Sequence, residues 1–207
     1  RRRSVRSVRV AVLASGHGSN LQALLDSVHG HEVDIVAVAS DRADAGALER
    51  AAAARVPARV FPLSNYDDRP ARDIAIADWL AALGVELVIL AGYMALLTPG
   101  FIARFPDRIV NVHPSLLPAF AGIRSIQQAM DYGVKVVGVT VHLVDDGVDT
   151  GAILLQRAID MPDTRDPEVV HAALQPLEHE LLPEGVRLLA AGRVRRDPDD
   201  PQRLVIT

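Results

Sequence analysis

The feature that most constrains the fold is the alternation of short, continuously apolar runs with alanine- and leucine-rich stretches of helical periodicity. Continuous apolar runs are typical of strands buried on both faces of a parallel sheet. They are residues 8–15, 33–40, 58–63, 85–93, 108–115, 136–144 and 152–159. The helical stretches are residues 20–28, 46–56, 70–84, 98–105, 125–133 and 166–192, with a break near Pro176. We therefore predict an α/β fold: a mostly parallel sheet with helices on both faces.

The chain divides into one large domain and two short ends. Its 207 residues are enough for a single hydrophobic core. We expect residues 1–8, RRRSVRSV, to form a disordered basic tail, because short runs of like charge are usually solvated. Residues 9–195 form the domain, and residues 196–207 form a C-terminal extension that adds an edge strand through RLVIT.

Composition narrows the classes of function. The net charge of −4 argues against a nucleic-acid surface. The absence of cysteine excludes disulfides, thiol nucleophiles and thiolate zinc sites, and it agrees with a cytoplasmic location. No apolar stretch has the length of a membrane span or a secretory signal. None of the seven histidines forms an HxxxH or HExxH pair, so we expect no metal site, and small molecules as the only ligands.

The segment SGHGSNLQ lies between the first predicted strand and the first predicted helix. Gly16 and Gly18 allow a tight turn, and Ser19 or Asn20 can cap the helix. The free N–H groups of a helix start favour an anion, and a phosphate is the natural guest. The segment is neither the dinucleotide pattern GxGxxG nor a Walker loop, so an ordinary capped turn is the alternative interpretation.

Asn111 and His113 lie two residues apart in a predicted strand and should therefore point to the same side of the sheet. An amide can donate to an oxygen that gains negative charge, and an imidazole can carry protons at neutral pH. An aspartate from VDDGVDTG, residues 144–151, near His113 would favour the imidazolium. The alternatives are a structural histidine and an acidic surface turn.

The chain has no GxSxG nucleophile elbow, so a hydrolase of that class is not expected. An amide, an imidazole and a carboxylate without a covalent nucleophile indicate direct transfer between two bound substrates. The enzyme would position the pair and stabilise a tetrahedral intermediate.

Five motifs occur in the order and spacing of the phosphoribosylglycinamide formyltransferases, which are members of the formyl-folate transferases. They are SGHGSNLQ, LAGYM, NVHPSLLPAF, GVTVHLVDDGVDTG and LEHELLPEGVRLLAAGRV. The resemblance covers residues 9–194 and implies a Rossmann-like twisted sheet. It further implies transfer of a formyl group from 10-formyltetrahydrofolate, as co-substrate, to the amine of glycinamide ribonucleotide.

The resemblance also implies roles for individual residues. Its catalytic residues are Asn111, His113 and Asp149. The residues that match its ribonucleotide site are Gly18, Ser19, Asn20, Gln175 and Glu178. The residues that match its folate site are Arg69, Met94, Ala95, Leu96, Leu97, Asp145, Asp146, Gly147 and Val148. No metal is implied, and the assembly is expected to be a monomer or a homodimer.

The sequence departs from the family pattern at four positions. Ala121 and Arg124 replace a proline and a histidine, and Ala95 and Ala152 replace an arginine and a proline. A guanidinium cannot take over proton transfer from an imidazole.

Several alternatives remain at this stage. The formyl-folate hydrolase carries an N-terminal regulatory domain and a histidine in place of Pro114, and the initiator-tRNA enzyme carries a C-terminal β-barrel; neither pattern is expected here. A formyltransferase acting on a sugar amine, and a non-catalytic protein that binds nucleotide or folate, stay open.

Overall fold

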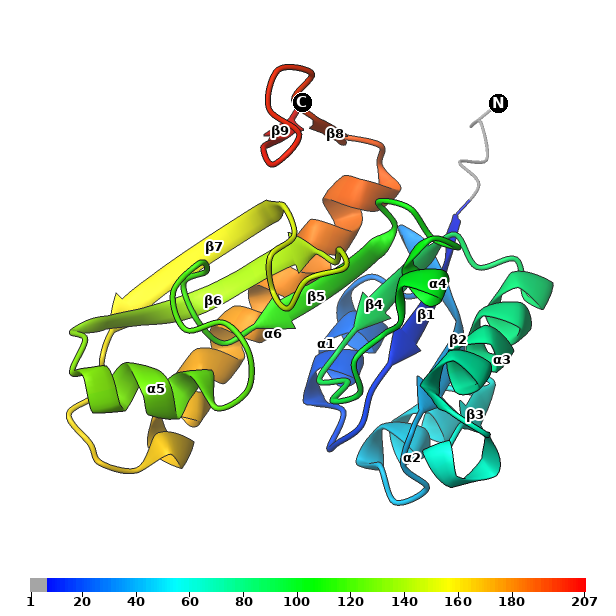
Figure 1. Cartoon of the computed structure of the whole chain (residues 1–207), viewed down its shortest axis with the longest axis horizontal. Coiled ribbons are helices and arrows are strands. Elements are labelled where there is room, and N and C mark those ends of the chain that lie inside the picture. Colours follow the sequence, from blue (N-terminus) through cyan, green and yellow to red (C-terminus); the bar gives the residue numbers. More distant parts are fainter. Residues whose placement is uncertain (1–6) are drawn as a thin grey trace.

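The computed structural model describes residues 7–207, and its main element is a seven-stranded sheet in the order β3-β2-β1-β4-β5-β6-β7 (Figure 1). The strands are β1 (Val8–Leu13), β2 (Val33–Ser40), β3 (Ala58–Val60), β4 (Leu87–Leu90), β5 (Ile109–His113), β6 (Val136–Leu143) and β7 (Ile153–Asp160). The helices are α1 (Ser19–Ser27), α2 (Gly46–Ala53), the 3₁₀ helix η1 (Leu63–Asn65), α3 (Arg69–Ala82), α4 (Pro99–Ile102), α5 (Ser125–Tyr132) and α6 (Pro167–Ala190). A second, two-stranded sheet consists of β8 (Val194–Arg196) and β9 (Leu204–Ile206).

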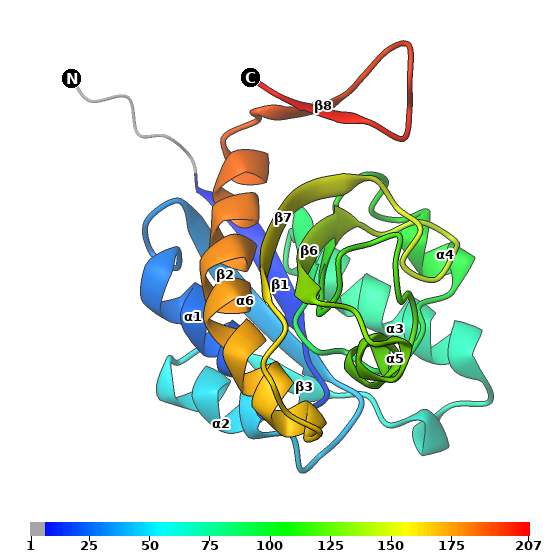
Figure 2. The same ribbon diagram turned by 90° about the vertical axis from the view of Figure 1, so that its left-hand side faces the viewer.

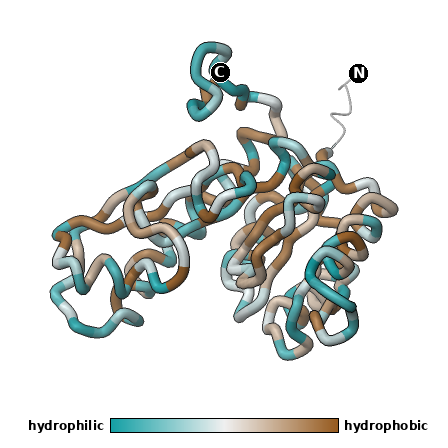
Figure 3. Tube along the Cα trace, in the orientation of Figure 1, coloured by the Kyte–Doolittle hydropathy of each residue, from teal (hydrophilic) through white to brown (hydrophobic). Residues whose placement is uncertain are grey.

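The central strand β1 shows why the apolar runs are continuous. Val10 and Val12 belong to one buried core, while Ala11 and Leu13 belong to the other. Helices α1 and α6 contribute to the first core and α3 to the second; Figure 2 shows them on opposite sides of the sheet. The hydropathy tube is accordingly brown along the central strands (Figure 3). Burial on both faces removes the polar positions that an exposed strand would show.

Strands β1 to β5 pair in parallel, whereas β6 and β7 are antiparallel to their neighbours. The predicted mostly parallel sheet is thus confirmed. The connection from β6 to β7, residues 144–152, is too short for a parallel crossover, which requires a dozen or more residues. The antiparallel register places Asn111 of β5 opposite His142 of β6.

Three boundaries differ from the sequence-based expectation. Helix α6 continues through Pro176 and Pro183 without a break, because its apolar side, including Leu174 and Leu181, is buried against the sheet. The C-terminal residues form β9, which pairs with β8 and does not extend the main sheet. Val8 already belongs to β1, and residues 1–6 of the proposed tail lie outside the described residues.

Among residues 7–207, no helix combines the length and apolar character needed to cross a membrane.

Candidate active site

Strand β5 delivers two polar side chains to the carboxyl end of the sheet, where ligands bind in open α/β folds. Asn111 and His113 are separated by one residue and therefore share a side of the strand. His113 is the last residue of β5 and is 7% exposed. A buried imidazole needs partners for its ring nitrogens, and both partners come from other segments.

Asp149 lies in the β6–β7 connection and joins the pair. Its Oδ2 is 3.4 Å from His113 Nδ1, and its Oδ1 accepts from Asn111 Nδ2 at 3.5 Å. The backbone N–H of Gly122 donates to Asp149 Oδ2 at 2.7 Å. Asp149 has φ 54°, in the left-handed region, which a non-glycine residue occupies only when its surroundings impose it. The structure therefore brings the three predicted catalytic residues together.

His142 is a fourth member that the sequence analysis did not identify. Its Nε2 lies 3.2 Å from Asn111 Nδ2 and 3.5 Å from Asp149 Oδ1, and its side chain is 2% exposed. The sequence contained one indication that His142 is unusual, because in VTVHLV it is a polar residue inside an apolar strand. Its position next to Asn111 follows only from the antiparallel register of β5 and β6.

The partners of the ring nitrogens determine which hydrogen bonds each form of the two imidazoles can make. His113 Nε2 faces the carbonyl oxygen of Phe120 at 3.1 Å while Nδ1 faces Asp149, so both nitrogens donate only in the protonated ring. His142 Nδ1 faces the Leu143 carbonyl oxygen at 2.8 Å. In the neutral His142 ring, Nε2 is therefore an acceptor for Asn111 Nδ2, and only the charged ring donates to Asp149.

Asp149 is the negative charge of this group. Burial raises its pKa, but the hydrogen bonds from His142 and the Gly122 N–H, together with the charges of the histidines, outweigh burial and lower the pKa to about 2. The carboxylate is therefore ionised at neutral pH, where it can stabilise a protonated His113.

The glycine loop leads directly into α1. Gly18 is the N-cap of the helix with φ 81°, and no side chain caps the first turn. The expectation that Ser19 or Asn20 caps the helix is wrong, because both residues lie within α1. Asn20 instead donates from Nδ2 to Glu178 Oε2 of α6 at 3.0 Å. The helix start retains backbone N–H groups suited to an anion.

The predicted ribonucleotide residues come from two elements that pack together. Gly18, Ser19 and Asn20 begin α1, and Gln175 and Glu178 lie one turn apart on α6. Asn20 and Glu178 are both buried, and the Oδ1 atom of Asn20 has no hydrogen-bond partner. An unpaired buried oxygen beside free N–H groups is suited to a ligand that carries a hydroxyl or amine donor.

The predicted folate residues lie in two loops and at one helix start. The loop of residues 94–97 follows β4 and is tied to the first loop, since Met94 N–H donates to Ser15 Oγ at 2.9 Å. In the loop of residues 145–148, Asp145 Oδ1 accepts from Gly147 N–H at 3.1 Å. Arg69 begins α3 on the surface and makes no side-chain contact to the other residues of the predicted set.

Two departures from the family pattern surround the Gly122 N–H that contacts Asp149. Ala121 precedes Gly122, and Arg124 is the N-cap of α5 with φ 59°. Arg124 is exposed and makes no side-chain hydrogen bond to a described residue. Ala152, the residue before β7, is fully buried. Ala121 and Arg124 therefore lie close to the Gly122 N–H that holds Asp149, the predicted catalytic aspartate.

Comparison with known proteins gives one consistent assignment. A model of the Formyl transferase family matches residues 8–186. Phosphoribosylglycinamide formyltransferase from Haemophilus influenzae is 41% identical over 189 residues, covering 90% of this chain and 89% of its own length. The protein of the same name from Mycobacterium tuberculosis is 45% identical, covering 88% of this chain and 85% of its own.

Among solved structures, glycinamide ribonucleotide transformylase 1 from Symbiobacterium toebii superimposes with a TM-score of 0.91 at 44% identity. The alignment covers 97% of this chain and 94% of that protein. The match in sequence and fold runs through β5, the β6–β7 connection and α6, which carry the residues described above. The chain belongs to the formyl transferase family.

Proposed function

We propose that this protein transfers the formyl group of 10-formyltetrahydrofolate to the amine of glycinamide ribonucleotide, a step of purine biosynthesis. The observation that carries the proposal is the convergence of Asn111, His113 and ionised Asp149 within 3.5 Å at the carboxyl end of the sheet. Relatives above 40% identity that bear the name of this activity support the same choice of substrates.

The ribonucleotide phosphate binds at the start of α1. The first-turn N–H groups and the positive end of the helix dipole attract the anion, and Gly18, with φ 81°, makes the turn that leads into them. Glu178 fixes the orientation of Asn20, whose free Oδ1 then accepts from a donor on the substrate. Gln175, on the same side of α6, adds a second polar contact to the ribonucleotide.

The folate co-substrate binds against the loops of residues 94–97 and 145–148. Met94, Leu96 and Val148 expose 69%, 56% and 48% of their surface, so they can cover the flat pterin ring. Backbone groups of the same loops, with Asp145 and Asp146, supply the polar contacts. Ala95 lacks the arginine side chain of the family pattern at this position. Recognition of the folate by this loop then relies on backbone and apolar contacts.

The chemistry is a direct transfer. The amine nitrogen of glycinamide ribonucleotide attacks the formyl carbon, and the carbonyl oxygen becomes an oxyanion. Asn111 Nδ2 and the protonated ring of His113 donate to that oxygen, since donors held in place stabilise the charge that develops there. In the free protein His113 Nε2 faces the Phe120 carbonyl oxygen and Asn111 Nδ2 faces His142 and Asp149, so the oxyanion replaces one of these acceptors for each donor. Asp149 keeps the proton on His113. The bond between the formyl carbon and N10 then breaks, and the proton lost by the amine passes to N10.

A spectroscopic assay of folate product tests the proposal. Purified protein receives 10-formyltetrahydrofolate with either glycinamide ribonucleotide or a nucleotide-linked amino sugar. We expect turnover with glycinamide ribonucleotide and a kcat/KM at least about a hundredfold lower with the sugar, because its anion would not reach the start of α1. The reverse preference would assign a sugar-amine formyltransferase. Binding without turnover, unchanged by His113→Ala, would assign a non-catalytic binding protein.

A further inference from the structure

The chain beyond α6 forms a hairpin that reaches back to the proposed active site. Strands β8 and β9 pair antiparallel, with Val194 opposite Ile206 and Arg196 opposite Leu204. Figure 1 shows this hairpin standing apart from the main sheet, and Figure 3 shows that it is largely hydrophilic. The residues that pack it against the core, Val194 and Leu204, are only partly buried.

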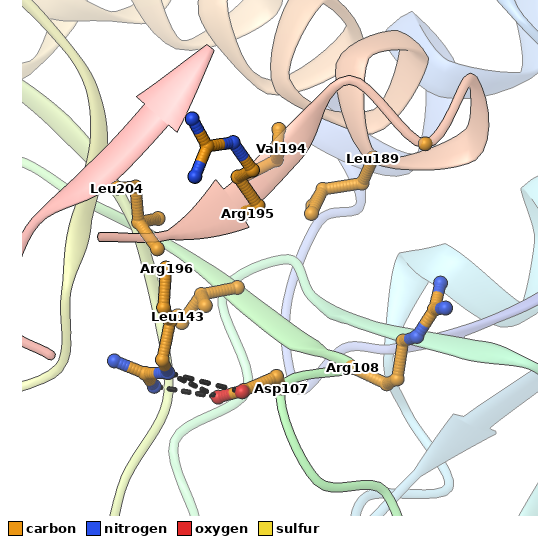
Figure 4. A pocket seen from close by; sticks show the side chains of 9 residues that line it. Asp107, Arg108, Leu143, Leu189, Val194, Arg195, Arg196 and Leu204 are labelled. Carbon is orange, nitrogen blue, oxygen red and sulfur yellow. Dashed lines mark hydrogen bonds and ion pairs between the residues drawn. The ribbon is translucent and has the colours of Figure 1, made fainter. Parts of the chain in front are cut away.

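The first anchor of the hairpin is an ion pair. Arg196 Nε donates to both oxygens of Asp107 at 3.0 Å, and Nη2 lies 2.5 Å from Oδ1 (Figure 4). The hydrogen bonds from Arg196 outweigh partial burial and lower the pKa of Asp107. Asp107 lies two residues before the start of β5, so this contact ties the hairpin to the strand that carries Asn111 and His113.

The second anchor reaches the residue after the catalytic aspartate. Gln202 Nε2 donates to the carbonyl oxygen of Thr150 at 2.8 Å. Thr150 Oγ1 donates to Asp145 Oδ1 at 2.6 Å, which closes the loop of residues 145–150 on itself. The hairpin turn is ordered by its own bonds, including Gln202 N–H to Asp200 Oδ1 at 3.1 Å. Gln202 is thus held at one end by the hairpin and at the other by the loop.

Between the anchors, the hairpin and the domain line a partly open pocket of about 160 Å³. Leu143 and Leu189 line it from the domain, and Val194 and Leu204 line it from the hairpin (Figure 4). Val194 and Leu204 are partly buried against the core, and the pocket leaves part of this contact unfilled. The two polar anchors therefore add to this apolar contact in setting the distance of the hairpin from the loop.

We propose that the β8–β9 hairpin positions the loop of Asp149, and that Gln202 is a positioning residue for catalysis. The inference rests on the proposed catalytic role of Asp149. The Gly122 N–H holds the side-chain carboxylate of Asp149, and Gln202 holds the backbone carbonyl group of the following residue, Thr150. Asp149 has a left-handed backbone, a conformation that the surrounding contacts help to maintain.

The effect on kinetics should be selective. Release of the loop moves Asp149 and residues 145–148, so kcat should fall and KM for the folate should rise. The residues of the proposed ribonucleotide site lie on α1 and α6 and have no hydrogen bond to Gln202 in the described structure, so KM for glycinamide ribonucleotide should not change. A general loss of fold would instead alter both KM values and lower Tm.

The test compares four variants of the full chain. Gln202→Ala removes the donor, and Gln202→Glu keeps the side-chain length but cannot donate to a carbonyl. Asp199→Ala is the matched control, because its exposed side chain makes no hydrogen bond in the described structure. We expect both Gln202 variants to lose about threefold to tenfold in kcat/KM for the folate, the scale of one hydrogen bond, and Asp199→Ala to lose none. Arg196→Ala should reproduce the Gln202 phenotype by releasing the other anchor.

Hydrogen exchange of residues 145–152 separates this inference from the proposed function. Faster exchange in Gln202→Ala than in Asp199→Ala supports the positioning contact even when no turnover is observed, in which case only the proposed function fails. Unchanged exchange and folate kinetics within twofold of the wild type overturn the inference. An equal loss in Asp199→Ala, or an equal rise of both KM values, also overturns it.

Discussion

The start of α1 and the end of β5 form two halves of one proposed site, but they are constructed differently. At α1, a contiguous segment supplies the glycine turn and the helix start, and the buried hydrogen bond from Asn20 to Glu178 joins it to α6. At β5, the three residues of the proposed catalytic group are not adjacent in the sequence, and Asp149 comes from a distant loop.

The two halves differ in which groups provide the electrostatic attraction for the substrates. The α1 half attracts an anion with backbone N–H groups that exist in any helix start. The β5 half depends on an ionised carboxylate between two imidazoles, which requires the antiparallel register of β5 and β6. Substrate binding and catalysis should therefore respond separately to mutation.

The largest separation is expected at His113. His113→Ala removes the proton carrier and should lower kcat at least about a hundredfold, the usual scale for lost acid–base catalysis. KM for glycinamide ribonucleotide should change little, because the α1 half is intact. Steady-state assays measure both constants, with His31→Ala at an exposed position as the control. Near-normal kcat in His113→Ala would remove the assigned role.

Gly18→Ala tests the backbone of the α1 half. A Cβ at Gly18 would lie 2.7 Å from the Ala47 Cα, and the residue has φ 81°. We expect a loss of about 2 kcal/mol in the free energy of unfolding, measured by urea denaturation. Gly16→Ala is the matched control, since a Cβ there meets nothing within 4 Å. Equal losses in the two variants would show that the close contact with α2 is not responsible.

Glu178→Ala breaks the single hydrogen bond that joins α1 to α6 at this site. Asn20 then loses its buried acceptor, and KM for glycinamide ribonucleotide should rise about tenfold while kcat at saturation is retained. Glu178→Gln keeps an acceptor oxygen and should show a smaller rise. If kcat falls instead of KM rising, the two halves are not separable as described.

The smallest effect concerns stability at acid pH. The pKa of Asp149 is lowered to about 2, so its contribution to stability is present above pH 4 and is lost as pH falls toward 2. Asp149→Asn lacks this contribution. The difference in unfolding free energy between wild type and variant should therefore shrink from pH 4 to pH 2. A difference that stays constant over that range would contradict the lowered pKa.

The contrast between the α1 half and the β5 half also explains which features could be predicted from the sequence. The parallel core and the α1 loop follow from local patterns, namely continuous apolar runs and paired glycines, and the structure confirms both. The pairing of Asn111 with His113 also follows from a two-residue spacing. A capping role for Ser19 or Asn20 was wrong because Gly18 already ends the turn, which placed Asn20 inside the helix, where it bonds to Glu178.

Features that depend on long-range register were missed. His142 joins the site only because β6 runs antiparallel to β5, and the shortness of residues 144–152 was the available signal for the antiparallel β6–β7 pair. A break at Pro176 was expected from proline alone, whereas burial of α6 against the sheet maintains the helix. The C-terminal strand was correctly seen as β-forming, but its partner, β8, is a local one.

The most direct test of the account is a crystal structure with glycinamide ribonucleotide and tetrahydrofolate lacking the formyl group. We predict that the phosphate lies on the N–H groups that begin α1. The amine and N10 should face each other beside Asn111 and His113, with space for one carbon atom between them. An amine directed away from His113, or a phosphate bound elsewhere than α1, would contradict the central claim that these two halves act as one transfer site.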